Sequence, residues 1–139
     1  MGVKVQERKG IVRCLSFGLL TFLFTISIAV TAFGGQFEDA VSAYKRGDYA
    51  TAYRLWKPLA KQGETQAQYN LGVMFGDGRG VSQDNILAHM WFNIAVSALE
   101  GKGRNDAVKD RDLVASKMTP AQIAEAERLA REWKPKKDQ

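Results

Sequence analysis

The chain has 139 residues, which is the size of one ordinary domain. Hydrophobic residues make up 45% and charged residues 25%, a composition that excludes a disordered or collagen-like chain. Much of the formal charge of +5 lies in residues 1–32, so the remainder offers no concentrated basic patch for a nucleic acid. The single cysteine, Cys14, and the single histidine, His89, leave little for a disulfide, a metal site or a catalytic triad. Composition therefore favours a binding module over an enzyme.

Residues 1–32 have the pattern of an export signal. A polar, basic start is followed by an uncharged stretch, and its most apolar part, residues 19–30, has the length of a signal-peptide core. Small residues then fit a signal peptidase site, which predicts cleavage after Ala32 and a periplasmic or secreted protein. An uncleaved anchor in the inner membrane, facing the periplasm, is the alternative, because residues 14–33 are just long enough to cross a bilayer of about 30 Å.

After residue 36 the sequence predicts helices joined by glycine-containing loops, because apolar residues recur at helical spacing and no stretch alternates as a strand does. Asp48, Ser82 and Thr119 are expected to cap the second, fourth and last helices, the last in a capping box. Gly63 is expected to end the second helix and residues 101–103 the fourth. The expected helices, in chain order, are 37–46, 48–62, about 65–75, 82–100, about 107–117 and a last one after Thr119.

The second and fourth helices share one apolar pattern at a constant offset of 36 residues. The recurring residues are Ala52, Leu55, Trp56 and Leu59, then Ala88, Trp91, Phe92 and Ala95. A period of this length marks a repeat architecture in which helix pairs stack side by side. Gly72 is expected where the third and fourth helices cross closely, because a mid-helix glycine otherwise costs roughly 1 kcal/mol against alanine.

These residues resemble a known family. Residues 67–72 (AQYNLG), the glycine-rich run at 74–81 and the pair Trp91-Phe92 are similar to the Sel-one-like repeat, a relative of the tetratricopeptide repeat. The resemblance covers one full unit at 64–101. Residues 37–63 resemble a preceding unit with a shorter turn.

The resemblance implies an α/α superhelix. Together with the helices predicted above, this gives an all-α fold, a short solenoid of about two helix pairs plus C-terminal helices, which follows the signal peptide. The organisation expected is a signal peptide or uncleaved anchor at 1–32, a repeat domain at 37–134 and a basic tail at 135–139. Residues 104–134 are similar to the C-terminal end of small exported bacterial proteins with such repeats. Some exported members are braced by a cysteine pair in each repeat, and this chain has no cysteine after Cys14.

Candidate catalytic chemistry is sparse. The glycine-rich run at 76–80 is interpreted as a turn between two helices, because no strand precedes it and no Gly-Lys-Ser/Thr follows it. His89 has no second histidine or cysteine with which to share a metal, and is interpreted as a surface or half-buried side chain. No serine has the Ser-x-x-Lys arrangement or a nearby histidine that would activate it. The sequence predicts no catalytic residue, no cofactor and no metal.

The resemblance implies that the working surface is a concave face lined by the first helix of each repeat. The side chains expected to be exposed there, as a candidate partner-binding groove, are Gln66, Gln68, Asn70, Val73, Lys45 and Arg46. Two alternatives stay open. The face is merely solvated or covered by the C-terminal helix, or the basic tail at Lys134, Lys136 and Lys137 makes the contact instead.

The sequence therefore predicts an exported adaptor of the bacterial cell envelope that binds a protein or peptide and catalyses no reaction. It predicts no nucleic-acid partner, and a membrane contact only through an uncleaved N-terminal segment. The alternative is an envelope hydrolase or a cell-wall protein that binds β-lactam-type ligands, because some cysteine-rich relatives have been linked to such ligands.

Overall fold

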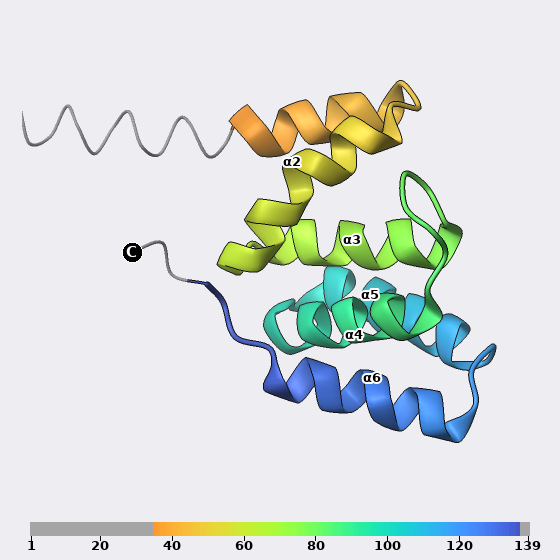
Figure 1. Ribbon diagram of the computed structural model, residues 1–139. Coiled ribbons are helices and arrows are strands. Elements are labelled where there is room, and N and C mark those ends of the chain that lie inside the picture. The colour runs from red at the N-terminus through yellow and green to blue at the C-terminus, as the bar shows by residue number, and fades with distance from the viewer. Residues whose placement is uncertain (1–34, 137–139) are drawn as a thin grey trace, which may run out of the picture. The chain divides into compact units, whose positions relative to one another are not determined.

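The computed structural model describes residues 35–136, and the predicted export signal lies outside them. Every regular element in this range is an α-helix, as expected (Figure 1). A first helix at residues 35–45 is followed by five more: α2 (Tyr49–Gln62), α3 (Thr65–Asp77), α4 (Asn85–Ala98), α5 (Gly101–Ala115) and α6 (Pro120–Glu132). From α2 to α5 each helix packs against the next, whereas α6 packs on α4, and α4 is central because it contacts α3, α5 and α6.

Three helix boundaries follow from local capping signals, as predicted. The Asp48 carboxylate accepts a hydrogen bond from the Thr51 N–H at 3.2 Å and begins α2. Gly63 ends α2 with a φ of 102°, and the N–H of Glu64 bonds back to the carbonyl of Leu59. Thr119 begins α6 in a complete capping box.

Two other boundaries were predicted wrongly. Asp84 begins α4 in place of Ser82, because its carboxylate accepts a hydrogen bond from the Leu87 N–H at 3.0 Å while Ser82 lies exposed in the preceding turn. Residues 101–103 do not end α4, which stops at Ala98; they form the first turn of α5. Two glycines are tolerated in that turn because packing of α5 on α4 outweighs their poor helix propensity.

The shared apolar pattern lies in the core, as predicted. All its members are buried except Leu55, which is half-buried. The expected close crossing of α3 and α4 at Gly72 is confirmed, because a Cβ atom on Gly72 would lie 2.7 Å from two atoms of the Phe92 ring. This crossing has no room for a larger side chain.

The glycine-rich run is the expected turn between helices, and it also joins the two helix pairs. Gly78 ends α3 with a φ of 67°, and Gly80, with a φ of 72°, passes the backbone of Tyr49 closely. Arg79 donates a hydrogen bond to the Tyr44 hydroxyl at 2.7 Å, and its guanidinium lies over the Tyr44 and Tyr49 rings. The loop of the second pair therefore packs on the turn of the first.

Candidate functional site

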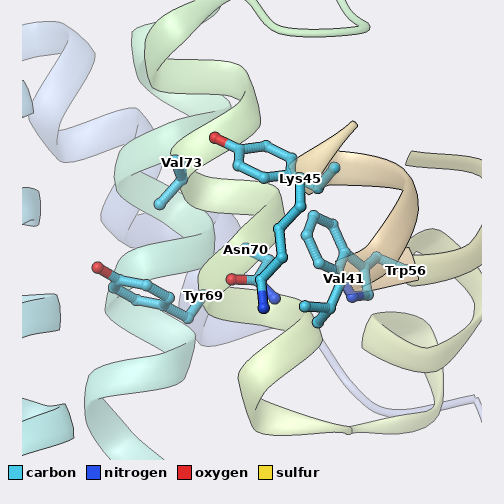
Figure 2. A pocket seen from close by; sticks show the side chains of 7 residues that line it. Val41, Lys45, Trp56, Tyr69, Asn70 and Val73 are labelled. Carbon is cyan, nitrogen blue, oxygen red and sulfur yellow. The ribbon is translucent and has the colours of Figure 1, made fainter. Parts of the chain in front are cut away.

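The first helix, α2 and α3 surround a hollow of about 270 Å³, called the first hollow (Figure 2). It is lined by Val41, Tyr44 and Lys45 from the first helix, Trp56 from α2, and Tyr69, Asn70 and Val73 from α3. On the first helix the lining residues are spaced i, i+3 and i+4, and on α3 they are spaced i, i+1 and i+4, so each set shares a helix face. The lining is mainly apolar or aromatic, with one cation and one amide.

Trp56 is a buried core residue that also borders the first hollow. Its side chain is 3% exposed, and its ring packs against Phe37 and Tyr44 with centroids 6.2 and 5.5 Å away. Its indole Nε1 is buried and has no hydrogen-bond partner in the described part of the chain. Buried polar groups are normally paired, so this indole N–H is an exception that needs an explanation.

A second hollow of about 260 Å³ adjoins the first along α3. It is lined by Gly76 and Asp77 from α3, Phe92 from α4, Asp110, Leu113 and Val114 from α5, and Lys117, together with Tyr69 and Val73. Tyr69 and Val73 line both hollows, so the two hollows adjoin along α3, and together they are called the groove. Leu113, which is 57% exposed, is a large apolar side chain left open to solvent in the second hollow.

Tyr69 stands between the two hollows in a fixed position. Its hydroxyl donates a hydrogen bond to the Asp110 carboxylate at 2.6 Å, and its ring lies 5.5 Å from that of Phe92. Burial, together with the neighbouring Asp110 carboxylate, raises the pKa of the Tyr69 hydroxyl well above its usual value. The hydroxyl therefore stays protonated and keeps tying α3 to α5.

The structure brings together three of the six residues predicted to form the partner-binding groove. Lys45, Asn70 and Val73 line the first hollow, whereas Gln66 and Arg46 are exposed but do not line either hollow. Val41, Tyr44 and Tyr69 were missed. The available signal was the helix face that Val41 and Tyr44 share with Lys45 and that Tyr69 shares with Val73.

Gln68 was predicted wrongly as a groove residue. It is 2% exposed, and its Nε2 donates a hydrogen bond to the carbonyl of Ala60 at 3.1 Å. Its position three and four residues before Leu71 and Gly72 places it on the buried face of α3. Residue type suggested exposure, but helical register decided the outcome.

His89 was expected at the surface or half-buried, and the structure places it in the core at 4% exposure. Its Nδ1 has no hydrogen-bond partner within residues 35–136. Burial, and secondarily the Arg111 guanidinium, lowers the pKa of His89, so the imidazole is neutral at pH 7. In the same range no group of three His, Cys, Asp or Glu side chains could hold a metal ion.

Two serine hydroxyls donate hydrogen bonds to backbone carbonyls three residues earlier in the chain. Ser97 donates to the carbonyl of Ile94 at 2.6 Å, and Ser116 donates to that of Leu113 at 2.7 Å. These contacts are ordinary helix back-bonds and are not those of an activated nucleophile. Among residues 35–136, no helix is both long and apolar enough to cross a membrane.

Stacked helix hairpins that share a lateral groove define an α/α helical-repeat protein. The Sel1 repeat matches the chain twice, at residues 37–64 and 65–98. The chain is also similar to the crystal structure of a protective antigen present in uropathogenic Escherichia coli strains, which displays an SLR fold, with a TM-score of 0.63 and 26% identity. That similarity covers 73% of this chain and 22% of the antigen, so the chain spans about a fifth of that structure. No curated protein matches the chain.

The chain therefore carries two Sel1 repeats, and the resemblance to the Sel1-like repeat family seen in its sequence is confirmed. Repeats of this kind generally mediate protein–protein interactions. The first repeat consists of the first helix and α2, and the second consists of α3 and α4.

Proposed function

We propose that this protein is an exported adaptor of the bacterial cell envelope that binds a partner protein through the groove and catalyses no reaction. The observation that supports the proposal is that two adjoining hollows share Tyr69 and Val73 as a common wall, with Leu113 exposed in the second. A depression that is mainly apolar in the first hollow and mixed polar and apolar in the second suits a peptide or protein segment. It needs no cofactor.

The location rests on the N-terminal pattern. A basic start, an apolar core and small residues before Phe33 support export to the periplasm or the medium. Cell fractionation with intact-mass measurement tests this point. We expect a mature chain that begins at Phe33 or within three residues after it. A full-length mass in the membrane fraction would establish the uncleaved anchor.

The binding function is tested by capture from envelope extract with a tagged protein and two matched variants. Val73→Arg places a charged side chain on the wall common to both hollows, so we expect it to abolish capture of the proteins that the wild type retains. Ala124→Arg introduces the same group at an exposed position of α6 and should leave capture intact. Circular dichroism and thermal melting must show that both variants are folded.

Unchanged capture by folded Val73→Arg would refute the groove as the binding surface. Reversing the charges of Lys134, Lys136 and Lys137 then tests the basic tail. Loss of capture in that variant alone would assign the contact to the tail.

A further inference from the structure

The first hollow presents three polar groups that have no partner within residues 35–136. These are the ammonium of Lys45, the carboxamide of Asn70 and the indole N–H of Trp56. Lys45 is exposed and Asn70 is half-buried, and Figure 2 shows both side chains over the hollow. The Trp56 indole N–H is buried behind the same lining, so Lys45 and Asn70 are the groups of the three that an occupant can reach directly.

This set of groups consists mostly of hydrogen-bond donors. An ammonium and an indole N–H only donate, and a carboxamide offers two donors and one acceptor oxygen. None of the seven residues that line the first hollow carries a carboxylate. The complementary occupant is therefore rich in acceptors and carries negative charge near Lys45.

The backbone state of the occupant follows from the same argument. In a helix the main-chain carbonyls are already bonded within the helix, except in its last turn. An extended segment leaves its carbonyls free to accept from donors such as Asn70. The first hollow thus favours an extended peptide over a helical one.

The charges around the second hollow indicate that the acidic side chain of such a peptide lies in the first hollow. Its lining carries Asp77 and Asp110 against Lys117 alone, so a carboxylate is less favourable there than beside Lys45. Leu113, in contrast, offers an exposed apolar seat. Tyr69 and Val73 connect the two hollows, so one extended chain can reach both.

We infer that the groove binds an extended peptide segment with an acidic side chain paired to Lys45 and an apolar side chain seated against Leu113. The inference rests on the proposed function and gives the chemistry of its partner. The acidic side chain beside Lys45 is what distinguishes this partner from apolar peptides in general.

The test is an NMR titration of ¹⁵N-labelled protein purified after expression of the full chain. The probes are acetyl-Ser-Glu-Thr-Val-Leu-amide and two relatives with Gln or Lys in place of Glu. A Trp56→Phe variant identifies the Trp56 signal among the three indole signals, and the other two belong to Trp91 and Trp133. We expect the Glu peptide to shift the Trp56 indole signal and to bind about two- to fivefold more tightly than the Gln peptide, with the Lys peptide weakest. The Trp91 and Trp133 signals, which come from residues outside the groove lining, should not move.

Matched variants assign the effect to Lys45 and to Leu113. Lys45→Gln should equalise the affinities of the Glu and Gln peptides, whereas Lys57→Gln should not, because Lys57 lies over the Tyr53 ring outside the groove lining. A peptide with Ser in place of Leu should bind more weakly to the wild type, and this loss should disappear in Leu113→Ser.

Two outcomes overturn the inference: no shift of the Trp56 indole signal at about 5 mM Glu peptide, where millimolar binding is visible, or equal affinities for the three peptides. If either occurs while Val73→Arg still abolishes protein capture, the groove function stands and only the acidic, extended partner is wrong. If the Glu peptide binds as expected but Val73→Arg leaves capture unchanged, the proposed function itself fails.

Discussion

The two repeats use one packing pattern and reach different results. The two repeats can be aligned on the glycine that follows the first helix of each, Gly47 and Gly78. Six residues before that glycine, the first repeat has Val41 and the second has Gly72. At the equivalent position of the second helix, the first repeat has Trp56 and the second has Phe92. Gly72 lets the Phe92 ring come so close that no Cβ fits between the helices. Val41 and Trp56 instead both line an open hollow.

The second repeat therefore contributes tight packing to the core, whereas the first repeat leaves a hollow at its surface. The closed crossing in the second repeat lies beside the central helix α4, where three other helices pack. The open crossing in the first repeat keeps an unpaired indole N–H and an unpaired lysine at its rim, within the described part of the chain. Variants at paired positions can therefore break one property while sparing the other.

The largest expected effect compares two amides on α3. Gln68→Glu puts a carboxylate against the Ala60 carbonyl in the core, so we expect it to lower the free energy of unfolding by about 3–5 kcal/mol at pH 7. Asn70→Asp lies at the first hollow and should change stability by less than about 0.5 kcal/mol. Urea unfolding measures both. Equal costs would mean that Gln68 is not the buried member of the pair.

The next effect tests the closed crossing directly. Gly72→Leu should lower the free energy of unfolding by about 3 kcal/mol, the upper range for overpacking, because even its Cβ overlaps the buried Phe92 ring. Gly76→Ala is the control. A Cβ there meets Ala88 and Val114 at 3.7 Å, an ordinary contact, so this change should be neutral or should stabilise by up to about 1 kcal/mol. A wild-type melting temperature for Gly72→Leu would contradict the crossing.

A smaller effect is expected in the loop that joins the repeats. Gly78→Ala should cost about 1–2 kcal/mol, because Gly78 has a φ of 67° that L-residues adopt with strain. Gly80 also has a positive φ, so the loop needs two glycines and not one. Thermal melting of Gly78→Ala checks this, and an unchanged melting temperature would show that the turn can relax.

Local signals in the sequence predicted the parts of this fold that depend on neighbouring residues only. Asp48, Gly63 and Thr119 satisfy backbone groups within a few residues, so their caps were readable without a tertiary structure. The start of α5 at Gly101 was not readable, because the helix there depends on packing against α4.

Three of the six residues predicted for the groove line the first hollow. Lys45, Asn70 and Val73 were expected on the face of the first helices and do line one hollow, and their part in binding stays a prediction. Gln68 and His89 were misplaced, because polar residue type was taken as a sign of exposure while helix register put both side chains in the core. Register was readable from the sequence for both residues, whereas the Ala60 carbonyl that satisfies the Gln68 amide is brought there by the tertiary structure.

The smallest expected effect is the pH dependence of the free energy of unfolding, which should come from His89 in α4 and not from the groove. Burial lowers the pKa of His89 in the folded state, so the unfolded chain, near the usual value of about 6.5, takes up the proton first. By linkage the free energy of unfolding should fall as the pH drops below about 6.5. The groups that face the imidazole are Arg111, which opposes protonation, and Glu127 and Asp112, which favour it.

Urea midpoints measured between about pH 7.5 and pH 5.5 test this dependence, a range above the titration of the carboxylates with lowered pKa, Asp48 and Glu125. His89→Gln should flatten the slope whatever it does to the midpoint itself, since no titrating group is left at that position. Lys45→Gln, a change in the groove, should leave the slope as it is in the wild type. Parallel slopes for wild type and His89→Gln would show that the buried imidazole is not the group that couples folding of the α4 region to pH.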